Sequence, residues 1–128
     1  MLLAVGEHVL DEFPVVCKRM GTGFSGGLGG TRQEACGALT GGVLVIGAML
    51  GRSTLDEGDR AAMNLSALYR SRFLGQFGET QCAPLRERVL ASEELGSCGA
   101  LVEESTRLLL TLFDEMRALG LRIGKEQA

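Results

Sequence analysis

The chain has 128 residues, a net charge of −3, and a composition that is 45% hydrophobic but only 5% aromatic. This length suits one domain with a real core, and no basic stripe is interleaved with aromatic residues, so nucleic-acid binding is not expected. The 19 glycines exceed the usual share, but they gather without a period in one loop and one helix, which excludes a collagen-like or disordered chain.

Apolar residues at spacings of three to four predict an amphipathic helix over residues 1–13, which ends before Pro14. Pro14 can open a second short helix over residues 15–20. A glycine-rich loop, residues 21–30, follows and begins with the Gly-x-Gly-x-x-Gly spacing of a dinucleotide fingerprint. That motif needs a preceding strand and a later acidic residue, and Ile46 stands where the acid would be. We therefore expect no nucleotide, and a loop whose backbone packs close to the cysteines.

The stretch from Thr31 to Gly51 organises the chain. Thr31 and Glu34 have the spacing of a capping box, and the uncharged run 35–50 predicts one helix closed by Gly51. This run is shorter than the roughly 20 residues that cross a bilayer, so we expect a buried core helix and no membrane span. Small residues at spacings of three to five would let another backbone approach this helix closely; they are Gly37, Gly41, Gly42, Gly47 and Gly51.

Thr54 and Glu57 form a second capping box before a helix over residues 55–77, which Gly78 would end. Acidic residues come early in this segment and basic residues late, as the helix dipole favours. Tyr69 lies on its apolar side, and we interpret it as a core aromatic residue rather than a catalytic acid.

Pro84 predicts a further short helix over residues 80–90, because proline is tolerated only in a first turn. Ser97 can cap a last helix that runs from Cys98 to about Leu119 and has a broad apolar face. No strand candidate remains.

The sequence therefore predicts one all-α domain over residues 1–128. We expect a compact bundle of five to six helices around the glycine-rich central helix, about 32–50, with a flexible tail over about 121–128.

The chain has four cysteines and one histidine, and no C-x-x-C pair, so a finger-type zinc site has no support. Its start lacks a basic region and a small-residue cleavage site, so we expect no signal peptide and a cytoplasmic location. In that compartment reactive thiols, transient disulfides and metal ligands are more typical than structural disulfides.

Cys36, Cys82 and Cys98 each fall in the first turn or so of a predicted helix. The N-terminal end of a helix carries partial positive charge and free N–H groups, which stabilise a thiolate and lower the thiol pKa. The thiolate is the form that attacks disulfides or binds metal. The alternative is that these cysteines are small hydrophobic residues that only pack.

The segment Cys36-Gly-Ala-Leu-Thr-Gly41 matches a CGAxxG signature, with a glycine-rich loop before it and Gly-x-x-x-Gly-Arg52 after it. Residues 77–85 and 98–102 look like the segments around that signature's third and fourth cysteines. From Phe24 to Leu112 the chain thus resembles the C_GCAxxG_C_C family of proteins regarded as redox-active.

The resemblance implies a small helical domain with four characteristic cysteines that are redox-active or bind a cluster; a similar domain is thought to hold an iron–sulfur centre in a multihaem cytochrome. It makes Cys36, Cys82 and Cys98 candidate redox thiols and candidate ligands of an iron–sulfur cluster or another thiolate-bound metal. Cys17 would be a fourth ligand. Three cysteines could instead support a disulfide between Cys82 and Cys98, with Cys36 as the partner thiol.

One feature departs from the family pattern. The family's first cysteine lies in an Asn-Cys-Ala-like segment that opens the first helix, whereas this helix begins at Met1 with no such residue. Cys17 comes too late to match it. We expect either a start that is truncated relative to the natural protein or a member that has lost one ligand. A four-thiolate cluster would then need Cys17, a non-cysteine ligand or a second subunit.

Three functions follow from these residues. The first is a redox protein whose three cysteines meet at one end of the bundle, for thiol–disulfide exchange or for electron transfer with a redox partner protein. The second is a non-enzymatic helical module that oligomerises or serves a transporter or an electron-transfer protein. The third is a small-molecule site that the glycine-rich loop closes near Cys36, where Gly37 and Gly41 let a cofactor approach the backbone. The apolar helices also favour a homodimer.

Overall fold

The computed structural model describes residues 1–123, and this part of the chain is all-helical, as predicted. Its only β pairing is an isolated antiparallel bridge between Ala35 and Gln81. The elements in chain order are α1 (Leu2–Val9), α2 (Val15–Met20), the 3₁₀ helix η1 (Thr22–Phe24), α3 (Gly37–Leu50), α4 (Arg60–Phe77), α5 (Cys82–Ala91) and α6 (Cys98–Ala118).

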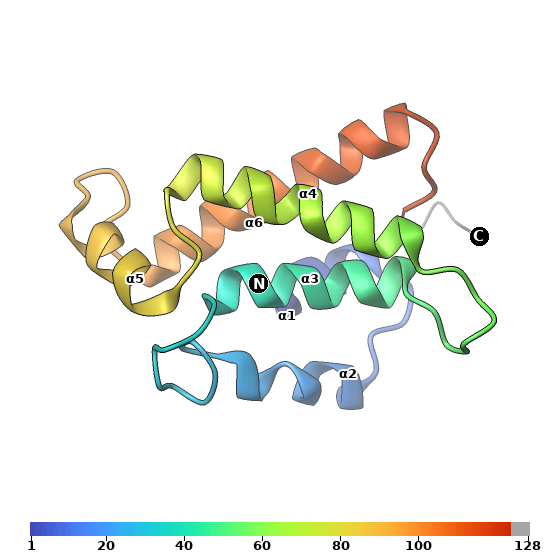
Figure 1. Cartoon of the computed structure of the whole chain (residues 1–128), viewed down its shortest axis with the longest axis horizontal. Coiled ribbons are helices and arrows are strands. Elements are labelled where there is room, and N and C mark those ends of the chain that lie inside the picture. Colours follow the sequence, from blue (N-terminus) through green and yellow to red (C-terminus); the bar gives the residue numbers. More distant parts are fainter. Residues whose placement is uncertain (124–128) are drawn as a thin grey trace.

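Helix α3 is central, as predicted, and contacts α1, α4 and α6. Figure 1 shows it between α4 above and α2 below, with α5 beside one end of the bundle. The compact packing of six helices confirms the predicted fold class.

The core gathers where α3, α4 and α6 meet. A row of aromatic rings runs along α4, with Tyr69 and Phe73 in edge-on contact at 6.1 Å and Phe73 and Phe77 at 4.7 Å between ring centroids. Phe113 of α6 and Ile46 of α3 are fully buried beside them. Edge-on rings contribute about 0.5–1.5 kcal/mol each beyond their buried area, so few aromatic residues suffice here.

The glycines of α3 serve two internal contacts rather than one continuous seam. A Cβ on Gly42 would overlap the Tyr69 ring, and one on Gly41 would lie 3.0 Å from the Cβ of Met1. Gly47 has open space around it. The close approach that the sequence predicts is therefore real at Gly41, where the start of α1 packs, and at Gly42, where α4 packs.

Several predicted helix ends are confirmed. Pro14 directly precedes α2, and Pro84 lies in the first turn of α5. Gly78 ends α4 in the left-handed region with φ +76°, where glycine has no Cβ to clash. The Ser97 hydroxyl accepts the Ala100 N–H at 3.1 Å and caps α6.

Both predicted capping boxes are wrong. Helix α3 begins at Gly37 and not near Thr31, whose hydroxyl oxygen lies 2.9 Å from two carbonyl oxygens of the preceding loop. Helix α4 begins at Arg60, and the Glu57 carboxylate accepts the Ser53 N–H at 2.8 Å within a turn. Thr31 thus stabilises the loop ahead of its helix, because a short polar side chain can bond the backbone of a turn as well as cap a helix, and Glu57 stabilises the turn ahead of α4.

The two ends of the chain also differ from a simple helical pattern. Helix α1 stops at Val9, and the Phe13 ring, where a longer helix was predicted, packs on Gly6 instead. Residues 124–128, most of the predicted tail, lie outside the described residues. Just before them Ile123 is buried, and its carbonyl accepts the Arg117 side chain at 3.1 Å.

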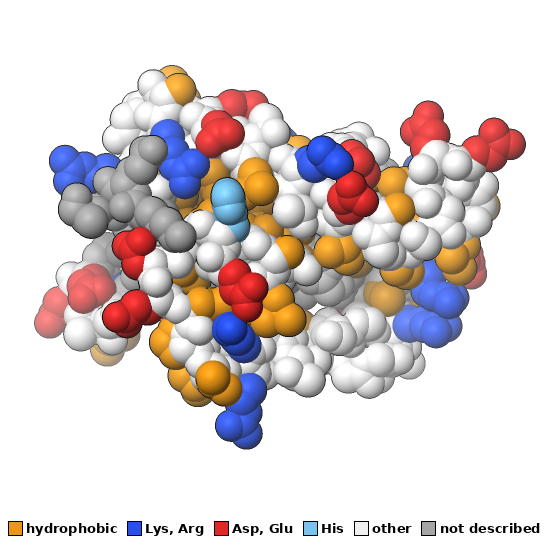
Figure 2. Space-filling view, turned by 180° about the vertical axis from the view of Figure 1, so that it is seen from behind, with side chains coloured by type: hydrophobic (Ala, Val, Ile, Leu, Met, Phe, Trp, Pro, Cys, Tyr) orange, Lys and Arg blue, Asp and Glu red, His pale blue; other side chains and the backbone are white. Residues whose placement is uncertain are grey.

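Helix α2 is the least buried helix. None of its residues is buried, and Val15, Val16 and Met20 are more than 60% exposed. Figure 2 shows hydrophobic side chains at the surface over this part of the molecule, next to basic ones. An ion pair at 3.0 Å between Lys18 and Glu7 links α2 to α1. In the described part of the chain, no helix combines the length and the apolar character that a bilayer span requires.

Candidate functional site

Three cysteines stand at the starts of three different helices. Cys36 immediately precedes α3, and Cys82 and Cys98 are the first residues of α5 and α6. The first-turn placement is confirmed for Cys82 and Cys98, while Cys36 lies just outside its helix. The first N–H groups of a helix have no partner within it, so each cysteine stands beside backbone donors that can stabilise a thiolate.

Backbone pairing holds the starts of α3 and α5 together. The Cys36 N–H donates to the Thr80 carbonyl, and the Cys82 N–H donates to the Glu34 carbonyl, each at 2.8 Å. Side chains two residues apart share a face of such a pairing, so Cys36 and Cys82 become diagonal neighbours. Sequence analysis missed this contact because it joins two loops that are far apart in the chain and carry no local signal for each other.

The glycine-rich loop packs directly against the second of these cysteines. A Cβ on Gly27 would lie 2.6 Å from the Cβ of Cys82 and 2.8 Å from the Cα of Arg32. Gly27 also has φ +71°, which L side chains rarely adopt. The prediction that this loop brings backbone close to the cysteines is confirmed. Its Gly-x-Gly-x-x-Gly spacing falls on η1, and no strand precedes it in the described chain.

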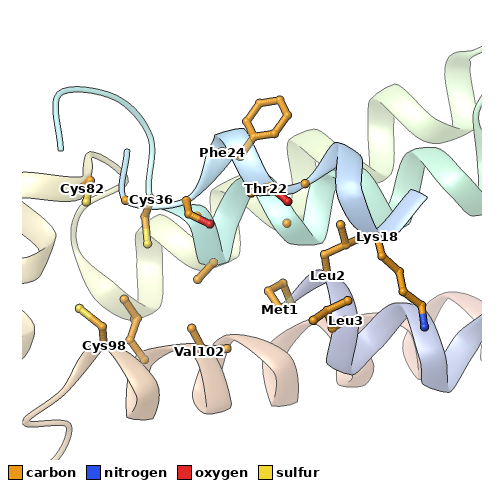
Figure 3. Close-up of a pocket in the computed structure, with 17 residues that line it drawn as sticks. Met1, Leu2, Leu3, Lys18, Thr22, Phe24, Cys36, Cys82, Cys98 and Val102 are labelled. Atoms are coloured by element: carbon orange, nitrogen blue, oxygen red, sulfur yellow. The ribbon is translucent and has the colours of Figure 1, made fainter. Parts of the chain in front are cut away.

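A cavity of about 470 Å³ lies where the three helix starts meet, and Cys36, Cys82 and Cys98 all line it. We call it the cysteine cavity. Figure 3 shows the Cys36 side chain between those of Cys82 and Cys98. Much of the remaining wall comes from α1, η1 and α6, through Leu2, Leu3, Thr22, Phe24, Leu101 and Val102. The structure therefore brings together the three cysteines that the sequence singled out.

The other residues proposed from the sequence are placed differently. Cys17 is half-buried on α2 and does not line the cysteine cavity. Gly37 and Gly41 do line it, but the chain itself approaches them: the Phe24 carbonyl oxygen lies 3.5 Å from a Cβ on Gly37, and Met1 lies against Gly41. Among residues 1–123, no three Cys, His, Asp or Glu side chains are grouped so that they could hold one metal ion.

The three thiols differ in exposure: Cys98 is exposed, Cys36 is half-buried and Cys82 is buried. Burial raises the pKa of the Cys36 thiol above its ordinary 9.0, the N–H groups of Ala38 and Leu39 lower it, and the charges of Cys82 and Cys98 raise it again. The lowered pKa predicted from the helix N-terminus is thus wrong for Cys36, because lost hydration outweighs the first-turn N–H groups.

Tyr69 connects the aromatic core to this cysteine. Its hydroxyl donates to the Ala38 carbonyl at 3.0 Å, and Gly42 leaves the space that the ring occupies. The Ala38 carbonyl belongs to the same peptide group as the Leu39 N–H, which stabilises the Cys36 thiolate. Burial, and then the charge of Cys36, raise the pKa of Tyr69, so its hydroxyl keeps its proton and remains a donor.

The fold and the site together define a small helical protein with three thiols on one cavity. Residues 1–112 match the model of a family described as "Putative redox-active protein (C_GCAxxG_C_C)", and the chain belongs to this family. The general redox role follows from that membership. No curated protein and no solved structure matches the chain.

Proposed function

We propose that this chain is a thiol redox protein in which Cys36, Cys82 and Cys98 form the reactive centre at the cysteine cavity. The observation that carries the proposal is that three cysteines from three helices line one cavity, although they are far apart in the sequence. They also differ in exposure, so one thiol can meet a substrate while another stays protected.

The exposed Cys98 is the group best placed to react first, because access limits thiol–disulfide exchange. Its thiolate attacks one sulfur of a substrate disulfide, a mixed disulfide forms, and the other sulfur leaves as a thiolate that takes a proton from water. Cys36, which lines the same cavity as Cys98 and is affected by its charge, then attacks the Cys98 sulfur. This step releases the second substrate thiolate and leaves a Cys36–Cys98 disulfide, so two electrons pass from protein to substrate.

The raised pKa of Cys36 suits the second role. A thiol that holds its proton resists modification by other oxidants, and it attacks once the mixed disulfide has formed beside it. Cys82, buried and a diagonal neighbour of Cys36, is the alternative resolving thiol, which would give the Cys82–Cys98 disulfide that three cysteines could also support.

An iron–sulfur or other thiolate-bound metal centre is the other chemistry that three thiols could support. The described donors do not meet in a metal-binding arrangement, so we derive no step through a metal. The absorption spectrum of protein purified without oxygen separates the two: charge-transfer bands between thiolate and iron would overturn the thiol mechanism, and a colourless protein with reactive thiols supports it.

The test of thiol exchange is equilibration in redox buffers of 2-mercaptoethanol and its uncharged disulfide, followed by acid quenching, alkylation and peptide mass spectrometry. We expect a disulfide that joins Cys98 to Cys36 and vanishes in Cys36→Ser and Cys98→Ser. Cys17→Ser is the control and should leave it unchanged. Four free thiols at every buffer ratio would overturn the proposal. The predicted homodimer and redox partner stay predictions; sedimentation at several protein concentrations tests the first.

A further inference from the structure

Beyond its cysteines, the cysteine cavity has a largely apolar wall. Leu2 and Leu3 come from α1, and Leu101 and Val102 come from α6. Val102 follows Cys98 by one helical turn, so both side chains lie on the same face of α6 and rise into the cavity (Figure 3). A volume of about 470 Å³ falls in the range of sites that enclose small organic molecules.

The cavity offers little to a charged ligand. Among the described residues that line it, Lys18 has the only charged side chain, and Met1 adds its α-amino group. Its ammonium group is already paired with the Glu7 carboxylate at 3.0 Å and lies 5.4 Å from the centre of the Phe13 ring. Figure 3 shows Lys18 at the end of the cavity remote from the cysteines. A ligand carboxylate beside Cys98 would therefore meet no cationic side chain there, and the free N–H groups of the helix starts would replace its lost hydration only in part.

We propose that the substrate of this site is a small, uncharged disulfide with apolar substituents, rather than a charged, hydrophilic one such as glutathione disulfide. The inference rests on the proposed thiol function and specifies its substrate class. The apolar substituent lies against Leu101 and Val102 of α6, which places the sulfur–sulfur bond at Cys98, one turn along α6 from Val102.

The reaction follows the same two steps as the thiol–disulfide exchange proposed above. The Cys98 thiolate forms a bond to one substrate sulfur, the substrate S–S bond breaks, and the leaving apolar thiolate takes up a proton from water. Cys36 then closes the protein disulfide and releases the second apolar thiol. One disulfide is reduced for each protein dithiol oxidised.

The experiment compares two aryl disulfides that differ in charge: neutral dithiodipyridine and dianionic dithiobis(nitrobenzoate). The rate at which each modifies Cys98 is measured by rapid quenching and mass spectrometry. Each rate is divided by the rate for the same cysteine in urea-unfolded protein, which removes the intrinsic reactivity of the reagent. We expect this normalised rate to be at least about tenfold larger for the neutral disulfide.

Two variants locate the effect. Val102→Lys places a cation beside Cys98 inside the cavity and should reverse most of the preference. Glu103→Lys makes a larger charge change on the next, exposed residue, which pairs with Arg107 outside the cavity, and should leave the preference nearly unchanged. Circular dichroism establishes that each variant is folded, and the wild-type ratio stands as a test even if one is not.

The outcomes separate the inference from the proposed function. Equal normalised rates, with the Cys36–Cys98 disulfide still forming, would overturn the apolar substrate class and leave thiol exchange intact. An equal shift in both lysine variants would show that the preference reflects net charge and would also overturn it. No disulfide with either reagent would remove the proposed function itself.

Discussion

Two walls of the cysteine cavity differ in burial. The stable wall consists of α3 and α6, which also build the hydrophobic core, and the exposed wall consists of α2 and η1, which have no buried residue. The first wall carries Cys36 and Cys98, and the second carries Lys18 and Phe24. Segments with few buried apolar contacts open at a lower free energy than the core. The difference teaches that Cys36 and Cys98 lie at the starts of helices that belong to the core, whereas we expect α2 and η1 to open more readily than those helices.

The largest effect should come from emptying the core behind the stable wall. Phe113→Ala removes a fully buried ring from α6 and should lower the free energy of unfolding by about 3–5 kcal/mol. Val16→Ala on exposed α2 should change it by less than about 0.5 kcal/mol. Urea unfolding followed by circular dichroism measures both, and similar losses in the two variants would abolish the distinction between the walls.

A second prediction concerns the glycine-rich loop where it joins the two walls. Gly27→Ala forces a Cβ against Cys82 at a positive φ and should cost about 3 kcal/mol. Gly29→Ala, at φ +61° with nothing within 4 Å, should cost only about 1 kcal/mol. The same unfolding experiment compares them. If Gly29→Ala cost as much stability as Gly27→Ala, backbone strain alone would explain both losses. The contact of Gly27 with Cys82 would then contribute nothing.

Local structure could be predicted from the sequence, whereas contacts between distant segments, such as Gly27 with Cys82, could not. The helices, their order, the stop of α4 at Gly78 and the start of α6 after Ser97 follow from local signals, because turn and cap preferences depend on adjacent residues. The three cysteine positions at helix starts were also predictable. The sequence could not show that Thr31 would bond the preceding loop, because its hydroxyl suits a cap or a turn equally.

The pKa of Cys36 and the hydrogen bonds around it could not be predicted from the sequence either. A helix start predicts a lowered thiol pKa, but the pKa of Cys36 depends on how deeply the rest of the chain covers it. The hydrogen bond from Tyr69 to Ala38 had no signal either, since it joins α4 to α3 through tertiary packing. Sequence therefore located the three cysteines that line the cavity, and only the assembled fold showed how their surroundings differ.

A third prediction tests whether the hydrogen bond from Tyr69 to Ala38 affects the pKa of Cys36. Tyr69→Phe removes the donor to Ala38, so the Leu39 N–H becomes a weaker partner for the Cys36 thiolate and the pKa of Cys36 should rise further. The loss of the hydrogen bond should also cost about 1 kcal/mol of stability. The pH dependence of Cys36 alkylation measures the pKa. Phe73→Leu, in the same aromatic row, is the control for destabilisation alone and should leave that pKa unchanged.

The pH dependence of stability follows from the same two groups. Cys36 and Tyr69 both have raised pKa values, so the folded state holds their protons more tightly than the unfolded state does. Their contribution is complete below the ordinary values of 9.0 and 10.0 and is lost as the pH rises through the folded-state values. Urea unfolding at a series of pH values should show stability falling above about pH 9. Tyr69→Phe should flatten the upper part of that fall, and an unchanged curve would contradict the burial of its hydroxyl.

The smallest effect should come from a change in the exposed wall, which α2 and η1 form. Lys18→Ala removes a partly exposed ion pair with Glu7, and such pairs contribute about 0.5 kcal/mol. Amide hydrogen exchange should become about twofold faster in α2 and stay unchanged in α4. The Cys36 alkylation profile should also stay unchanged. A shift in that profile would mean that both walls control the thiol.

The backbone pairing between the starts of α3 and α5 sets an order for the folding of the chain. Each helix can begin to form from local contacts, but the pairing closes a long loop, and Cys98 joins only when α6 docks. We therefore expect the three thiols to meet late in refolding, after most helical structure has formed. Pulsed alkylation during refolding would then find Cys36 and Cys82 open to modification at times when circular dichroism is already close to native. Oxidation in that interval could join Cys17 to one of the three cavity cysteines, from which the folded protein separates it. Such a disulfide would block folding, so we expect Cys17 to lower the refolding yield under oxidising conditions.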